Sequence, residues 1–128
     1  MRQRARRRRW PAGRATGRYG EDLAHRFLEK HGYRVVARNY RPPDGAGEID
    51  LVAWDGDMLV FVEVKTRATE AFGSPDRAVG REKERHLDRA GREYARRAKV
   101  PGDRIRFDIV NVVLDNPPRL ELLRAAFQ

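Results

Sequence analysis

The sequence predicts an α/β domain in which helices flank a mixed β-sheet. Apolar residues recur at helical spacing near residues 19–31 and again near residues 87–98. Between these segments lies a strong β-hairpin signal, and residues 58–62 are apolar on both faces, as expected for a strand covered on both sides. The expected order is helix, three strands, helix and strand (αβββαβ), with residues 119–123 as a candidate last strand.

The first helix is predicted from a single apolar stripe. Its apolar positions run from Tyr19 to His31, three to five residues apart, and Gly32 supplies the stop signal. Glu21 lies at the edge of the stripe. Its side chain is therefore expected to reach over the surface on which the helix packs.

Three strands are expected next. Residues 33–40 are rich in Val and Tyr and end at a run of turn-forming residues. Residues 48–54 and 57–65 flank Asp55 and Gly56, a dipeptide suited to a two-residue hairpin turn. This turn would place Trp54 opposite Asp57. The strand at 57–65 is expected to be central, because residues 58–62 are apolar on both faces.

A charged helix and two strands complete the expected fold. The helix is predicted between Gly80 and Lys99, ahead of a Pro-Gly stop signal. Residues 105–114 form the next expected strand, with which residues 119–123 can pair. Because a helical crossover joins parallel strands, the strand at 105–114 should run parallel to a strand of the hairpin.

Length and charge indicate one folded domain after a basic arm. The 128 residues have room for one domain, predicted at 17–128 after a disordered arm at 1–16. Residues 1–18 contain eight arginines and no acid, whereas the remaining residues hold 20 basic and 19 acidic groups. Eight of the nine net positive charges therefore lie in residues 1–18. Its candidate phosphate contacts are Arg6, Arg7, Arg8 and Arg9.

Features that the sequence lacks exclude several kinds of site. It contains no cysteine, which excludes disulfides and thiolate zinc sites and fits a cytoplasmic location. Its apolar stretches are far shorter than the roughly 20 residues of a membrane-spanning helix. We therefore expect a cytoplasmic protein that has no membrane partner.

The predicted hairpin gathers acidic residues on one face of the sheet. In its register Glu48 faces Glu63, and Asp50 faces Phe61. Because side chains alternate between faces, Glu48, Asp50, Glu63 and Lys65 all share one face. Facing carboxylates repel each other, and a divalent cation removes the repulsion. Mg²⁺ or Mn²⁺ suits these oxygen ligands, while the Lys65 ammonium would balance negative charge on a phosphoryl group.

The same spacing also fits a purely structural arrangement. In that case Glu63 and Lys65 form a salt bridge at a strand end, and Glu48 and Asp50 are solvated residues beside a loop. Spacing alone leaves both interpretations open.

Three short motifs carry further information. They are Gly-Arg-Tyr-Gly-Glu at 17–21, Gly-Glu-Ile-Asp-Leu-Val at 47–52, and Phe-Val-Glu-Val-Lys-Thr-Arg at 61–67. Together they make residues 17–126 resemble the YraN-like family of small bacterial proteins. That family is similar to restriction-endonuclease-like (PD-(D/E)xK) enzymes, and among them to archaeal Holliday junction resolvases. The resemblance implies the restriction-endonuclease-like fold, an αβββαβ core.

The resemblance also implies roles for individual residues. Asp50 and Glu63 would be the ligands of Mg²⁺ or Mn²⁺, and Lys65 would be the catalytic lysine. Glu21 would be a further acidic member of the site. Glu48, which the predicted register places on the same face, is a candidate accessory residue. The chain departs from the family signature at Ile49, which precedes Asp50 where the signature has proline.

These implications lead to two functional hypotheses. The first is a metal-dependent endodeoxyribonuclease that hydrolyses phosphodiester bonds, including those of branched or junction DNA. The second is a non-catalytic nucleic-acid-binding module, or a subunit of a DNA repair or uptake assembly. Arg67 and Lys83 are further candidate contacts to nucleic acid, and either hypothesis is compatible with a homodimer.

Overall fold

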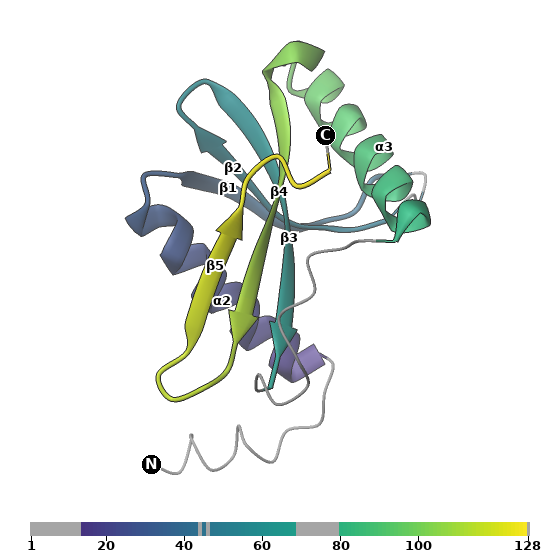
Figure 1. Cartoon of the computed structure of the whole chain (residues 1–128). Coiled ribbons are helices and arrows are strands. Elements are labelled where there is room, and N and C mark those ends of the chain that lie inside the picture. The colour runs from purple at the N-terminus through teal and green to yellow at the C-terminus, as the bar shows by residue number, and fades with distance from the viewer. Residues whose placement is uncertain (1–13, 44, 46, 69–79, 128) are drawn as a thin grey trace.

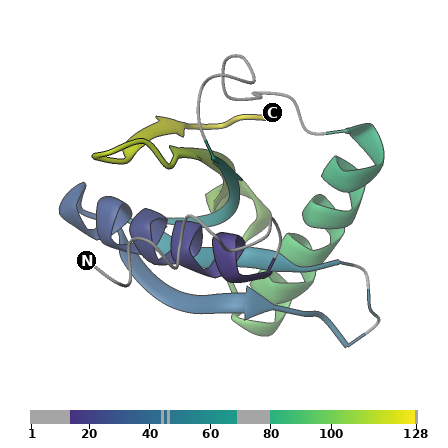
Figure 2. The ribbon, with the colours of Figure 1, turned by 90° about the horizontal axis from the view of Figure 1, so that it is seen from below.

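The computed structural model describes residues 14–43, 45, 47–68 and 80–127, and in it one five-stranded sheet carries a helix on each face (Figures 1 and 2). Its elements are, in chain order, α2 (Arg14–Lys30), β1 (Arg34–Tyr40), β2 (Ile49–Asp55), β3 (Met58–Arg67), α3 (Arg81–Arg97), the 3-10 turn η2 (Gly102–Arg104), β4 (Ile105–Val113) and β5 (Arg119–Leu123). The predicted order is confirmed, and it includes the candidate last strand.

The strands lie side by side in the order β1-β2-β3-β4-β5, which makes β3 central. The β3–β4 pair is parallel, and the three other pairs are antiparallel. Both findings confirm predictions, because α3 is the crossover that returns the chain to the start of a parallel strand. The fold is therefore the expected α/β fold with an αβββαβ core and a mixed sheet.

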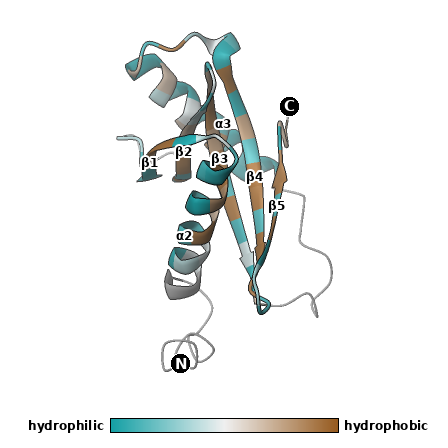
Figure 3. Cartoon of the chain, turned by 90° about the vertical axis from the view of Figure 1, so that its left-hand side faces the viewer, coloured by the Kyte–Doolittle hydropathy of each residue, from teal (hydrophilic) through white to brown (hydrophobic). Residues whose placement is uncertain are grey.

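Successive side chains of β3 lie on opposite faces of the sheet. Val62 packs in the core cluster that contains Leu28 of α2, and Phe61 packs in the cluster that contains Leu87 of α3. We call these sides the α2 face and the α3 face. Along β4, hydrophilic bands interrupt the hydrophobic colouring (Figure 3). Neither helix in the described ranges has the length and apolar character that a membrane span requires.

The first helix begins earlier than predicted. It starts at Arg14, so residues 14–16 belong to α2 and not to the arm. Arg and Ala are good helix formers, and the amphipathic turns that follow propagate the helix backwards. The rest of the predicted arm, including the four candidate arginines, lies outside the described residues.

The hairpin turn lies one residue later than predicted. It consists of Gly56 and Asp57 instead of Asp55 and Gly56, and Trp54 pairs with Leu59 instead of Asp57. Gly56 has a φ of 63°, which suits the first central position of a type II′ turn. The observed register places the partly buried indole of Trp54 opposite the buried side chain of Leu59, and this apolar contact favours it over the predicted register.

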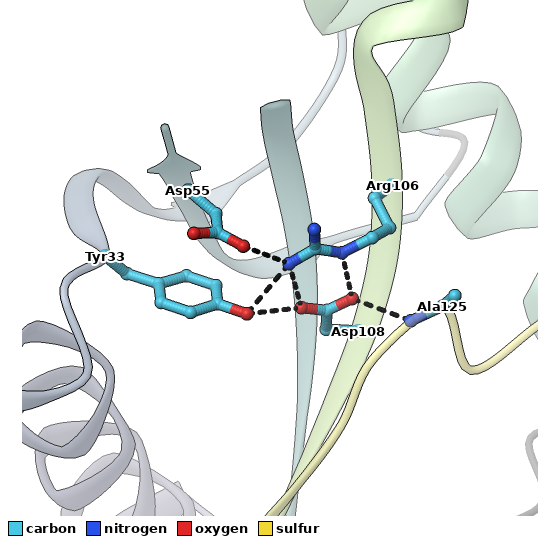
Figure 4. Close-up of polar contacts among 5 residues, drawn as sticks. All are labelled: Tyr33, Asp55, Arg106, Asp108 and Ala125. Carbon is cyan, nitrogen blue, oxygen red and sulfur yellow. Dashed lines mark hydrogen bonds and ion pairs between the residues drawn. The ribbon is translucent and has the colours of Figure 1, made fainter. Parts of the chain in front are cut away.

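A buried polar cluster on β4 joins distant parts of the chain (Figure 4). Asp108 is fully buried and accepts hydrogen bonds from the Tyr33 hydroxyl at 3.0 Å, from the Ala125 amide at 2.9 Å, and from Arg106 at 2.9 and 3.0 Å. Arg106 also donates to Asp55 at 2.9 Å. We call Tyr33, Asp55, Arg106 and Asp108 the Asp108 cluster. It links β4 to the residue that precedes β1, to β2 and, through the Ala125 amide, to the C-terminal segment.

Replacing Tyr33 by Phe is expected to lower the free energy of unfolding by about 1–2 kcal/mol, because it removes a buried hydrogen bond. Burial, together with the charge and hydrogen bond of Asp108, raises the pKa of Tyr33 from its ordinary value of 10.0 to about 12. Folding therefore favours the neutral phenol, and the wild-type advantage should decline as the pH rises from 10.0 to about 12. Urea unfolding of both proteins across this window measures the difference. A difference that is independent of pH would contradict the argument.

Candidate metal site

The candidate site lies where β2 and β3 separate. Their last paired residues are Leu51 and Val62, whereas β3 continues beside β4 as far as Arg67. Asp50 and Glu63 occupy the next positions of the two strands, and they lie close enough for the charge of Glu63 to act on Asp50. An Asp50 carboxylate oxygen accepts a hydrogen bond from the Val64 amide at 2.8 Å. The carboxylate thus bonds to the β3 backbone where the ladder with β2 has ended.

The observed register corrects the predicted partners of these residues. Phe61 pairs with Val52 and not with Asp50. Glu48 precedes β2 and forms an ion pair with Arg41 at 3.5 Å, so the expected Glu48–Glu63 pairing is wrong. The register moved by two residues, which is one full period of the side-chain alternation, so the paired residues of β2 and β3 keep their predicted faces.

Lys83, in the first turn of α3, lies against the acidic pair. Its ammonium forms an ion pair with Glu63 at 2.5 Å, and Glu63 is only 5% exposed. Burial lowers the pKa of Lys83, but the hydrogen bond and charge of Glu63 outweigh this effect and raise the pKa overall. The ion pair places the start of α3 beside the acidic pair.

Asp50 is strongly affected by its surroundings. Burial is the largest cause that raises its pKa, to about 8, and the charges on Glu63 and Glu21 add to it. The Val64 amide and the Lys83 ammonium act in the opposite direction but do not cancel the increase. Burial and the neighbouring carboxylates thus both disfavour the ionised form of Asp50.

Glu21 approaches this region from the α2 face. A Cβ atom on Gly20 would collide with the Thr66 side chain, so glycine at this position lets α2 lie directly on β3. The Glu21 carboxylate accepts a hydrogen bond from the Asn39 side chain at 3.2 Å and lies 3.7 Å from the Arg38 guanidinium. Residues of β1 thus hold Glu21 near the separation of β2 and β3, where its charge helps to raise the pKa of Asp50.

Lys65 lies two residues beyond Glu63 on the α3 face. In the parallel register its neighbour is Asn111 of β4, and Arg67 follows two positions later. Lys65 forms no ion pair with any residue that the structure describes, so the structural alternative of a Glu63–Lys65 salt bridge is wrong. Glu63 pairs with Lys83 instead.

Asn111 is a residue of this region that the sequence did not single out. It is 1% exposed, and neither polar atom of its side chain has a hydrogen-bond partner within the described ranges. Buried amides are usually paired, so this one is unusual. The available signal was an asparagine inside an otherwise apolar strand segment.

The donor set suits a hard divalent cation. Nowhere in the described ranges are three or more Asp, Glu or His side chains grouped as a metal site. The two carboxylates of Asp50 and Glu63 nevertheless suffice for Mg²⁺, which usually keeps several waters. The Lys83 ammonium already lies beside Glu63, and a cation beside Asp50 would offset the burial and the Glu63 charge that disfavour its ionised form. The residues present therefore fit Mg²⁺ or Mn²⁺.

Comparison with known proteins places the chain in a family. Residues 20–112 match the model described as "Uncharacterised protein family UPF0102". A UPF0102 protein of Solibacter usitatus is 56% identical over 97% of this chain and 92% of its own length. Two further relatives carry the same family name. The protein of Koribacter versatilis is 46% identical over 88% of this chain and 78% of its own length. The protein of Desulfosudis oleivorans is 47% identical over 87% of this chain and 88% of its own length. The chain therefore belongs to the UPF0102 family, which is the YraN-like family that its three motifs indicate.

Proposed function

We propose that this protein is a Mg²⁺- or Mn²⁺-dependent endonuclease of the cytoplasm that hydrolyses phosphodiester bonds in DNA, with branched or junction DNA as its substrate class. The observation that carries the proposal is the proximity of Asp50 and Glu63 where β2 and β3 separate. Lys65, which has no ion-pair partner among the described residues, lies on the α3 face two residues from Glu63. The membership of UPF0102 supports the proposal through the family's similarity to restriction-endonuclease-like enzymes.

Each residue has a separate task in this proposal. Asp50 and Glu63 would hold the cation, and the Val64 amide keeps the Asp50 carboxylate in place. A bound Mg²⁺ or Mn²⁺ would activate water and withdraw charge from the phosphoryl oxygens. The Lys65 ammonium can orient the attacking water or balance the negative charge that develops on the phosphoryl group. Glu21 adds negative charge on the side of α2.

Cleavage assays test this proposal directly. The full chain is incubated with four-way junction, nicked duplex, linear duplex and single-stranded DNA, each with Mg²⁺, Mn²⁺ or EDTA. We expect cleavage with either metal, none in EDTA, and the highest rate on the junction. Absence of cleavage on every substrate with both metals would rule out the enzyme and favour a binding module.

The charge distribution favours that second candidate function, nucleic-acid binding without cleavage. Eight arginines and no acid stand in residues 1–18, whereas the rest of the chain is almost neutral. A basic arm of this kind binds phosphates without reading bases. The arm would serve an enzyme equally well, so binding alone does not separate the two functions.

Deletion of residues 1–13, which precede α2, is expected to weaken DNA binding and to reduce its salt dependence. The deletion removes six of the eight arginines before residue 19. The magnitude of the slope of log affinity against log salt should fall by roughly 0.9 for each phosphate that the shortened chain no longer neutralises. Fluorescence anisotropy at several salt concentrations measures this slope, and thermal unfolding serves as the control. An unchanged slope, or unfolding of the shortened chain, would contradict the role assigned to the arm.

A further inference from the structure

We propose that Lys83 is a resident counter-ion of the acidic pair and competes with the divalent cation for Glu63. This inference rests on the proposed function, because it assumes that Asp50 and Glu63 bind a metal. It concerns a residue that the sequence analysis placed only among candidate contacts to nucleic acid. Its consequence is that the protein binds metal more weakly than its carboxylates alone would allow.

The geometry supports competition at one carboxylate. The Lys83 ammonium lies 2.5 Å from Oε2 of Glu63, within ion-pair distance. Glu63 is only 5% exposed, so little of its carboxylate remains open to a second cation. An ammonium and a divalent cation at neighbouring oxygens repel each other, and the repulsion is stronger at a buried site than in water. Metal binding at Glu63 therefore requires Lys83 to withdraw.

Lys83 is well placed to withdraw. Its side chain is 52% exposed, whereas that of Glu63 is 6% exposed, so the cation and not the carboxylate can move into solvent. A lysine ammonium sits on a flexible four-carbon stem. Lys83 also belongs to the first turn of α3, beyond the sheet that holds Asp50 and Glu63. The ion pair can thus open without disturbing either strand.

The two lysines near the site have different relations to the acids. Lys65 follows Glu63 on β3 yet has no ion-pair partner within the described part of the chain, while Lys83 comes from another element and neutralises Glu63. The charges of Asp50 and Glu48 also act on Lys83. Removal of the Lys83 charge should therefore make the site around Asp50 and Glu63 more negative.

The test compares Lys83→Met with Arg85→Met in the full chain. Both variants remove one positive charge and keep an aliphatic side chain. Arg85 is exposed and lies roughly 200° around α3 from Lys83, so it controls for the general effect of charge. Isothermal titration calorimetry with Mn²⁺ at low ionic strength gives the dissociation constants. We expect Lys83→Met to bind Mn²⁺ about tenfold more tightly than wild type, and Arg85→Met to stay within about twofold.

Two further measurements keep the inference testable if Lys83→Met folds poorly. Lys83→Arg retains the charge and should bind Mn²⁺ no more tightly than wild type. In the wild-type protein, the side-chain NMR signals of Lys83 should shift on titration with Mg²⁺ as the ion pair opens. Unchanged or weaker Mn²⁺ binding by Lys83→Met, or Lys83 signals that do not move when Mg²⁺ binds, would overturn the inference.

These results separate the inference from the proposed function. If wild type binds metal and cleaves DNA but Lys83→Met gains no affinity, the competition is refuted and the nuclease proposal stands. If Lys83→Met binds Mn²⁺ more tightly and no variant cleaves DNA, the competition is supported and the nuclease proposal fails. If neither wild type nor Lys83→Met binds metal, both are refuted.

Discussion

Replacement of Asp50 by Asn is expected to lower DNA cleavage by at least about a hundredfold and to leave DNA binding nearly unchanged. The amide keeps an oxygen that can accept the hydrogen bond from Val64, so the local backbone should be preserved. It removes one of the two carboxylates that would hold the cation, and the loss of one important electrostatic group at an active site has effects of this size. Lys65→Ala should also abolish cleavage, but metal binding should persist because Lys65 is not a ligand.

The same substitution should raise the melting temperature of the metal-free protein. Burial and the charge of Glu63 disfavour the ionised form of Asp50, as its raised pKa shows, and a neutral amide avoids both effects. A gain in stability that accompanies a loss of activity marks a residue kept for function. Cleavage assays, Mn²⁺ titration and thermal unfolding are the measurements.

Asp57→Asn provides the matched control for Asp50→Asn. Asp57 lies in the hairpin turn at the other end of β2 and forms an exposed ion pair with Arg104. Its replacement should leave cleavage, metal affinity and stability almost unchanged. Cleavage by Asp50→Asn at the wild-type rate would refute the metal site. If wild type does not cleave and Asp50→Asn alters neither metal affinity nor stability, the binding module becomes the better interpretation.

The sequence predicted that Asp50 and Glu63 share one face of the sheet, and the two-residue error in the register does not change this. Side chains alternate with a period of two along a strand, so a shift of two residues keeps Asp50, Glu63 and Lys65 on the predicted face. A shift of one would have separated them. The ambiguity arose at Asp55-Gly56-Asp57, where either dipeptide can form a two-residue turn. Burial of Trp54 opposite Leu59 favours the observed choice.

Contacts between distant segments could not be predicted in the same way. Lys83 reaches Glu63 only because α3 begins beside the end of the sheet, and no local pattern specifies that position. The Tyr33–Asp108 hydrogen bond joins residues 75 positions apart. Propensity and spacing describe elements and faces, whereas such pairs depend on how the helices and the C-terminal segment pack on the sheet.

Replacement of Asp108 by Ala is expected to lower the free energy of unfolding by about 3–5 kcal/mol. The carboxylate is fully buried and accepts hydrogen bonds from Tyr33, Arg106 and Ala125. Its removal leaves the Arg106 guanidinium, which is only 15% exposed, with the Asp55 carboxylate as its ion-pair partner among the described residues. The Tyr33 hydroxyl and the Ala125 amide also lose this hydrogen-bond acceptor. Total stabilities of small domains are about 5–15 kcal/mol, so this loss would leave much of the protein unfolded under mild denaturing conditions.

Urea unfolding of Asp108→Ala and Asp115→Ala separates the buried cluster from an ordinary surface pair. Asp115 forms an ion pair with Arg119, and the two side chains are 35% and 53% exposed, so its loss should lower the free energy of unfolding by less than about 1 kcal/mol. The stability loss of Asp108→Asn should fall between those of the two alanine variants. The amide oxygen of Asn can still accept hydrogen bonds from Arg106 and Ala125, but its NH2 group would face an Arg106 N–H donor. If Asp108→Ala does not fold, the Asp108→Asn value carries the test. Equal small losses for the Asp108 and Asp115 variants would show that the Asp108 cluster does not stabilise the fold, because the desolvation of Asp108 and Arg106 would then offset their hydrogen bonds.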